Sequence, residues 1–207
     1  MILTKVSYFC CMARIQTRKD VSRKDVIILA AASLFREKGF KAASMRDLAV
    51  KVGVEAASLY NHIRSKNELL HDICFNVAHA FLEHLSLVEA SNATPIEKLE
   101  TLLRFHIRQM ITNFEEVHIS DREWRYLTEP YLSDYQNQRR QYRRRFAAVI
   151  EEGIAQDDIK KIDPTTAVLI LLHAIGGIEA WHRSTQKISG EELEENMITI
   201  LIGGLKK

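Results

Sequence analysis

Residues 44–70 read SMRDLAVKVGVEAASLYNHIRSKNELL and contain two short helical segments separated by a glycine. Ser44 can cap the first segment, and Asp47 follows three residues later, as in a capping box with a shortened acid. The first helix is predicted to stop at Gly53, and the second is predicted to cover residues 55–63. Two short helices joined by a tight turn are typical of a helix-turn-helix, whose second helix enters the major groove of DNA.

The residue types of the second helix suit contact with DNA. It begins with small side chains, which allow close approach to base edges: Ala56, Ala57 and Ser58. Tyr60, His62 and Lys66 carry donors suited to phosphates, although Tyr60 could instead be half-buried against the preceding helix. Ser44 and Arg46 stand at a helix N-terminus, which attracts a phosphate. The apolar residues of the stretch are interpreted as its small core: Leu48, Ala49, Val52, Val54 and Leu59.

The rest of the chain shows helical periodicity and cap signals, with no strand-like alternation and no internal repeat. Only 8 glycines and 3 prolines occur in 207 residues, which favours long helices. We therefore predict an all-α fold of about nine helices. The expected segments are 22–39, 44–52, 55–63, a long helix after Ser65, 94–114, a short helix within 115–129, 130–156, 164–183 and 190–203.

Charge is divided unevenly along the chain. Residues 1–66 contain 13 Lys and Arg against 5 Asp and Glu, a net charge of +8, whereas residues 67–207 contain 16 against 22, a net charge of −6. A basic first third on an acidic remainder indicates a polyanionic partner at one end of the molecule. The alternative interpretation is that the basic residues of the first third only form a charged surface exposed to solvent.

Other classes of protein lack support in the sequence. Cys10, Cys11 and Cys74 form neither a disulfide framework nor a metal-binding spacing, and they fit a reducing cytoplasm. The apolar stretch 167–178 is expected to be too short to cross a membrane. We find no catalytic constellation, metal set or cofactor motif, so we expect a non-enzyme without cofactors. Residues 1–11 show no helical pattern and are interpreted as an extension ahead of an alternative start at Met12.

Four segments in order resemble the DNA-binding domain of TetR-type repressors: AAASLFREKGF at 30–40, SMRDLA at 44–49, GV at 53–54 and LYNHIRSKNELL at 59–70. The resemblance covers about residues 22–70 and departs at Ile63, where the family usually has Phe. It implies a DNA-binding role for Ser44, Arg46, Ala56, Ala57, Ser58, Tyr60, His62 and Lys66. Glu55 and Ala56 replace the commoner small polar start of the second helix, which leaves the base preference open.

The same resemblance implies a division of the chain and a mode of action. We expect a flexible basic arm at 1–21, a DNA-binding domain at 22–66, and a ligand-binding and dimerisation domain at 67–207. TetR-type proteins are homodimers whose last two long helices form a four-helix bundle with the partner, and here these helices are 164–183 and 190–203. The alternative is that these helices are buried within one chain. The resemblance implies a repressor that binds a palindromic operator and is released from it by a small-molecule ligand.

The effector is predicted from a fainter resemblance, to TetR-type regulators that respond to fatty acyl-coenzyme A. It extends to regulators of related coenzyme A thioesters and rests on Arg139, Tyr142, Phe146 and residues 151–153, 180–183, 188–189 and 203–205. Arg139 and Arg143 share one helix face and could hold phosphates, while aromatic side chains could line an acyl pocket. The candidate effector residues are Phe105, Trp124, Arg139, Tyr142, Arg143, His173 and Trp181.

Several alternatives stay open at this point. The arginines could form a solvated or acid-paired face, and the aromatic residues could be ordinary core. A cationic effector would prefer acidic residues such as Glu123 or Glu179. A helical carrier or enzyme, in which the basic third only solubilises the chain, belongs to another class of function.

Overall fold

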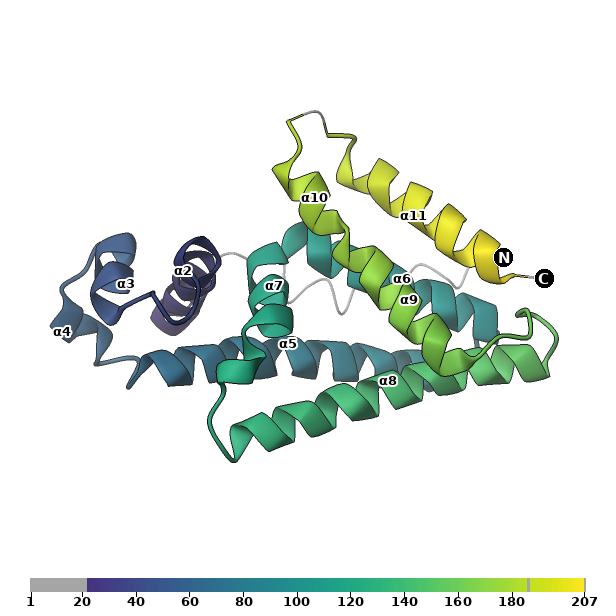
Figure 1. Cartoon of the computed structure of the whole chain (residues 1–207), viewed down its shortest axis with the longest axis horizontal. Coiled ribbons are helices and arrows are strands. Elements are labelled where there is room, and N and C mark those ends of the chain that lie inside the picture. The colour runs from purple at the N-terminus through teal and green to yellow at the C-terminus, as the bar shows by residue number, and fades with distance from the viewer. Residues whose placement is uncertain (1–21, 186, 207) are drawn as a thin grey trace.

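The computed structural model describes residues 22–185 and 187–206, and the described residues are almost entirely helical (Figure 1). The predicted basic arm at 1–21 lies outside them. Three short helices form the N-terminal head: α2 (Arg23–Lys38), α3 (Met45–Val52) and α4 (Ala56–Leu59). The body consists of α5 (Lys66–Glu89), α6 (Pro95–Thr112), α7 (Phe114–Arg122), the 3-10 turn η1 (Trp124–Tyr126), α8 (Tyr131–Ala155), α9 (Pro164–Gly176), α10 (Ile178–Arg183) and α11 (Gly190–Leu205). The predicted all-α fold is confirmed.

Local cap chemistry explains most helix starts. Ser44 accepts a hydrogen bond from the Asp47 N–H at 3.2 Å, and the Asp47 carboxylate accepts one from the Ser44 N–H at 3.0 Å, so the predicted capping box is formed. Thr94 caps α6 in the same way, with Pro95 in the first turn. At Ser65 only half of the box forms, because Glu68 accepts from the Arg64 N–H at 2.7 Å instead.

Two predicted helices differ from the observed ones. The segment expected at 55–63 is helical only over α4, and residues 60–63 form turns that end on the buried Ile63. The segment expected at 164–183 is divided at Gly177 into α9 and α10. The longer segment Pro164–Arg183, which contains the stretch 167–178, is long and apolar enough to cross a membrane by length and composition alone, with 28% of its apolar window buried. One such helix is weak evidence for a membrane span, because core helices of soluble proteins pass the same test.

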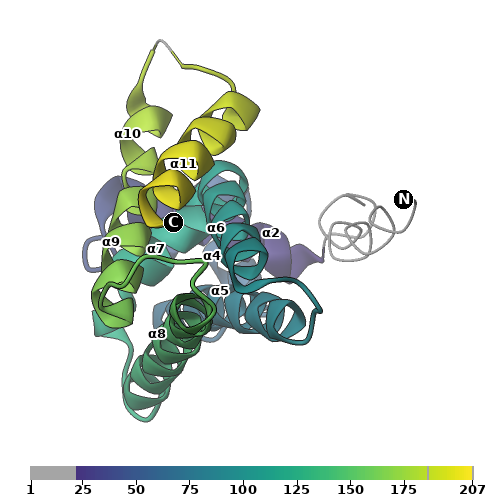
Figure 2. The same cartoon turned by 90° about the vertical axis from the view of Figure 1, so that its right-hand side faces the viewer.

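The body is built around the long helices α5 and α8, which lie side by side along the longest axis of the molecule (Figure 1). Helix α6 packs on both of them, and α9 packs on α6 and α8. Helix α11 packs on α6, so α9, α10 and α11 lie on the same side of the body (Figures 1 and 2).

Two hydrophobic cores hold the molecule together. The body core joins α5, α6, α8, α9 and α11. The head core joins α2, α3 and α4 to the first half of α5, and it also takes in Ile119, Leu127 and Tyr135 from the body. The head is therefore packed directly against α7, η1 and the start of α8, which provides a physical route between the two parts.

Candidate nucleic-acid interface and effector site

The turn between α3 and α4 is fixed by backbone geometry. Gly53 has φ 74° and ψ 37°, the left-handed conformation that favours glycine. The Val54 N–H donates to the Ala49 carbonyl at 3.0 Å, and Leu48 and Leu59 are buried in the core that also contains residues of α2 and α5. This arrangement leaves the outer side of α4 at the tip of the molecule (Figure 1).

The predicted DNA-binding residues surround that tip. Tyr60 is 54% exposed, which argues against its alternative placement in the core, and Ala57, His62 and Arg46 are also exposed. Ala56 and Ser58 are half-buried on α4. A small-residue helix flanked by exposed Tyr, His and Arg donors can approach base edges and reach phosphates on either side.

Ser44 and its partner Asp47 are committed to the helix cap. The Ser44 hydroxyl donates to the Asp47 carboxylate at 2.6 Å and accepts from the Asp47 N–H. The pKa of Asp47 is lowered to about 2, first by the hydrogen bond from Lys38 and then by those from Ser44. Ser44 is exposed, and its predicted contact with a phosphate stays a prediction.

Lys66 has a structural task that the sequence analysis missed. Its ammonium group donates to the carbonyls of Phe40 at 2.7 Å, Lys41 at 3.1 Å and Ala43 at 2.8 Å, and it lies 4.6 Å from the centre of the Phe40 ring. An ammonium group has three donors, so these bonds use all of them. Lys66 therefore holds the loop before α3 in place, and its phosphate role stays a prediction.

The head is coupled to the body by ion pairs and ring contacts. Arg36 on α2 pairs with Glu115 on α7 at 3.1 Å, and the guanidinium group lies over the Phe114 ring. Phe40 stacks on Tyr126 of η1 with ring centres 5.7 Å apart. These contacts join α7 and η1 directly to the head.

Two predicted effector residues, Phe105 and Tyr142, lie in one cluster inside the body. Phe81 of α5 contacts both rings, with centres 5.2 Å from Phe105 and 6.0 Å from Tyr142. The Tyr142 hydroxyl is hydrogen-bonded to His106 Nε2 at 2.6 Å. Burial lowers the pKa of His106 to about 3 and raises the pKa of Tyr142, so this pair is uncharged at neutral pH.

Sequence reasoning missed both histidines of this cluster. His84 of α5 stacks on Phe105 at 3.9 Å between ring centres, and burial lowers its pKa to about 4. Its Nδ1 is buried and has no hydrogen-bond partner within residues 22–185 and 187–206. One feature of the sequence could have identified His106: it lies among the apolar residues of α6, where a polar side chain is unexpected.

Trp124 and Arg139 form a separate group at the joint between head and body. The Arg139 guanidinium donates to Asp121 at 2.8 Å and lies 5.5 Å from the Trp124 ring centre and 5.9 Å from that of Tyr135. Arg145 is likewise paired with Glu89. Of the two interpretations of the arginine run, pairing with acids is the one observed for Arg139 and Arg145.

The other predicted effector residues lie on different surfaces. Arg143 is half-buried on α8, next to Tyr142 in the chain. His173 is exposed on α9 and is hydrogen-bonded to the Leu169 carbonyl at 2.7 Å. Trp181 on α10 donates to the Ile188 carbonyl at 3.1 Å, which holds the segment before α11. The structure therefore does not bring the seven residues into one pocket.

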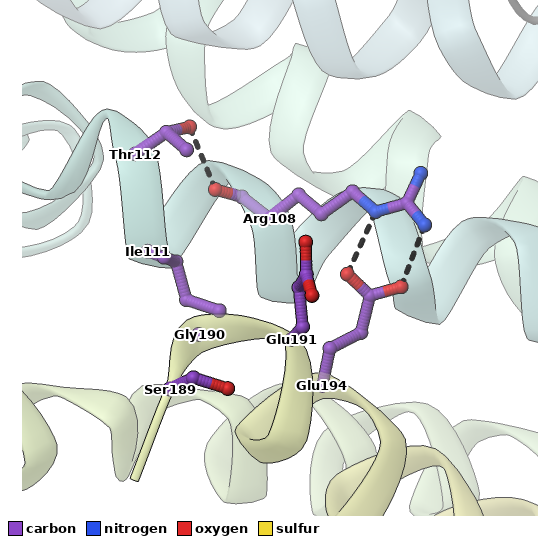
Figure 3. A pocket seen from close by; sticks show the side chains of 7 residues that line it. All are labelled: Arg108, Ile111, Thr112, Ser189, Gly190, Glu191 and Glu194. Atoms are coloured by element: carbon purple, nitrogen blue, oxygen red, sulfur yellow. Dashed lines mark hydrogen bonds and ion pairs between the residues drawn. The ribbon is translucent and has the colours of Figure 1, made fainter. Parts of the chain in front are cut away.

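Two open hollows of about 400 Å³ occur on the surface, and neither is lined by a predicted effector residue. One lies on the outer face of α8 among Asn137, Arg140, Gln141 and Arg144. The other, shown in Figure 3, lies between α6 and the start of α11. Within the described residues no group of three His, Cys, Asp or Glu side chains is arranged to hold a metal ion.

Comparisons with known proteins agree with this architecture. Residues 27–73 match the profile of bacterial regulatory proteins of the tetR family, and residues 92–205 match the tetracyclin repressor-like C-terminal domain. The HTH-type transcriptional repressor KstR2 of Mycolicibacterium smegmatis is 21% identical over 189 residues, covering 90% of this chain and 92% of that protein. KstR2 of Mycobacterium tuberculosis strain H37Rv is 23% identical over 188 residues, covering 90% and 94%.

Solved structures give the same result for the fold. The structure of the ketosteroid transcriptional regulator KstR2 of Mycobacterium tuberculosis has a TM-score of 0.83 at 22% identity and covers 91% of this chain and 97% of that one. AibR in complex with isovaleryl coenzyme A and operator DNA has a TM-score of 0.75 at 26% identity and covers 87% and 98%. The two profiles together span the head and most of the body, and the chain belongs to the TetR family of transcriptional regulators.

Proposed function

We propose that this protein is a homodimeric repressor that binds a palindromic operator and releases it when a coenzyme A thioester binds in the body. This proposal rests on the helix-turn-helix. Ser44 caps α3, Gly53 ends it, and the outer side of the following α4 is exposed, in a chain that belongs to a family of DNA-binding regulators. The names of its KstR2 relatives support repression. AibR, which is crystallised with both isovaleryl coenzyme A and operator DNA, supports the class of effector.

The proposed DNA contacts follow from exposure. Ala57 faces base edges, while Arg46, Tyr60 and His62 contact phosphates or base edges around α4. Ala56 and Ser58 allow the close approach, Ser44 presents a helix N-terminus, and Lys66 acts by shaping the loop before α3. In a dimer the two heads would read half-sites separated by about one helical turn of DNA or a multiple of it.

The proposed dimer uses the outer face of α9, α10 and α11. Ile170 is 62% exposed and Ile200 is 71% exposed, and Leu169 is also exposed. Glycines at 203 and 204 are exposed on α11 and would allow a partner helix to approach closely. Apolar surface of this kind marks an interaction site, and in a TetR regulator a partner subunit accounts for it without a membrane.

The proposed effector site is the cluster around Phe105 and Tyr142. An acyl chain suits its apolar rings, and the uncharged His106–Tyr142 pair can offer a hydrogen bond to a thioester carbonyl. Trp124, Arg139, Arg143, His173 and Trp181 lie outside this cluster, so their contact with the effector stays a prediction from the sequence and is not part of the proposed site. A cationic effector has less support, because Glu179 already pairs with Arg122 at 2.8 Å and Arg183 at 3.5 Å.

Footprinting on the DNA that flanks the gene tests the proposal. We expect a protected palindrome, weakened operator binding by Tyr60→Ala, and release by acyl-coenzyme A but not by the free fatty acid or a lipophilic cation. Thermal-shift measurements with the same three compounds would show which of them binds the folded protein. Absence of a protected palindrome at moderate salt would refute the operator, and release by the cation alone would refute the effector class.

A further inference from the structure

Glu194 of α11 is buried, with 7% of its surface exposed, although it carries a carboxylate. Its partners are two arginines one turn apart on α6. Arg108 donates through Nε to Oε2 and through Nη2 to Oε1, each at 2.7 Å, and Arg104 donates through Nη1 to Oε1 at 2.9 Å. Figure 3 shows the Arg108 fork facing this carboxylate across the gap between α6 and α11.

Arg104 connects this carboxylate to two further acids. It donates to Glu100 one turn earlier on α6 at 2.8 Å and to Glu195 of α11 at 2.6 and 3.1 Å. These bonds raise the pKa of Arg104, with Glu195 the largest cause. The buried carboxylate of Glu194 and its two partners Arg104 and Arg108 are called the α6–α11 clasp below; Glu100 and Glu195 are outer partners of Arg104.

The clasp lies between the proposed effector cluster and the proposed dimer face. On α6, the residues between its two arginines include Phe105 and His106, which belong to the effector cluster. On α11, Ile198 one turn after Glu194 is buried, whereas Ile200 is on the outer side. A displacement of α6 would therefore reach the outer face of α11 through the clasp.

We propose that Glu194 is a positioning residue that sets the angle of α11 against α6, and thereby the separation of the two heads in the dimer. This inference rests on the proposed dimer through α9, α10 and α11. Apolar contacts between helices are not directional, so they tolerate small rotations and slides. A bidentate guanidinium–carboxylate fork fixes orientation as well as distance, and burial of the carboxylate lets few alternative partners replace it.

Distances between spin labels on the two heads test the inference on the full-length dimer. A label at Val50→Cys lies on the head, where Val50 is 83% exposed, after Cys10 and Cys11 are replaced by Ser. Cys74 is buried and burial raises the pKa of its thiol to about 12, so it should not react. We expect Glu194→Gln to broaden the inter-head distance distribution roughly twofold, since α11 then samples several angles.

Glu195→Gln is the matched control. Glu195 pairs with the same Arg104, but 65% of its side chain is exposed, so its removal should leave the distribution unchanged. If Glu194→Gln does not fold, Arg108→Lys keeps the charge, removes the fork and should broaden the distribution to a smaller extent. An unchanged distribution in a folded Glu194→Gln or Arg108→Lys dimer would overturn the inference. Absence of any inter-head signal in the parent would refute the dimer itself, which is a separate result.

Discussion

Replacing Lys66 by Met separates two roles that the same residue could have. The sequence predicts a phosphate contact, whereas the structure shows the ammonium group bonded to the carbonyls of Phe40, Lys41 and Ala43. Methionine keeps much of the length and apolar stem of the side chain but removes every donor. If Lys66 holds the loop, the substitution should weaken folding of the head more than it weakens contact with DNA charge.

The expected loss follows from the bonds. Two of the three acceptors are partly buried, and their carbonyls would lose a charged donor. Hydrogen bonds to charged groups contribute about 1.5–3 kcal/mol each, so at the lower value two of them amount to about 3 kcal/mol. With a urea slope of about 3 kcal/mol per molar, the unfolding midpoint of Lys66→Met should fall by about 1 M.

Urea unfolding and salt-dependent operator binding give the answer together. A lost phosphate contact lowers the slope of log affinity against log salt by about 0.9, so a structural Lys66 should leave the slope unchanged. Arg46→Met is the control with the opposite expected pattern, because Arg46 is exposed at the tip. The slope of log operator affinity against log salt should fall for this variant, while the urea midpoint of unfolding stays the same. A Lys66→Met protein with normal stability and a reduced slope would refute the structural role.

Three further outcomes follow from single sites. Burial lowers the pKa of His106 to about 3, whereas the unfolded chain takes up the proton below about 6.5; stability is therefore complete above 6.5 and is lost as the pH falls towards 3. Between pH 7 and pH 5, urea melts of the parent should lose about 2 kcal/mol more stability than melts of His106→Phe, which keeps the contribution of His84, whose pKa burial also lowers; equal pH dependence in both would contradict this. Gly53→Ala should cost about 1–2 kcal/mol in thermal melts, because its φ of 74° strains an L side chain even though a Cβ would meet no atom within 4 Å; an unchanged melt would contradict the strain. Ile170→Asp should give monomers in sedimentation, and a persistent dimer would mean that the interface lies elsewhere.

Local signals predicted the head well because its geometry is encoded within a few residues. The Ser44–Asp47 box and Gly53 determine where α3 begins and ends, and both devices are formed as expected. The second helix was predicted too long, since residues 60–63 turn so that Ile63 can enter the core shared with α5. The burial of Ile63 depends on its packing in the core with α5, and the sequence pattern of residues 55–63 alone does not show this packing.

The proposed effector cluster was harder to predict because its members come from different helices. Phe105 and Tyr142 are brought together by Phe81, which contacts both rings, and Tyr142 is bonded to His106; neither Phe81 nor His106 belonged to the predicted set. Lys66 was similarly assigned from its type and position, while its carbonyl partners lie 23–26 residues earlier in the chain. Periodicity shows which residues share a face, and only packing shows what that face contacts.

The arginines of α8 show how this limit bears on mechanism. At a spacing of four, Arg139 and Arg143 share one side of the helix, so the sequence favours a common anion. In the fold, Arg139 lies where α7, η1 and α8 meet, bonded to Asp121 and placed over the rings of Trp124 and Tyr135. Tyr135 belongs to the head core, and Tyr142, two turns along the same helix, belongs to the body core and to the proposed effector cluster. If the proposed effector displaces Tyr142, it acts on the helix that Arg139 joins to α7 and η1, and these two elements pack against the head. Under the proposed function, α8 would then link the effector cluster to α3 and α4 without a contact between Arg139 and the effector.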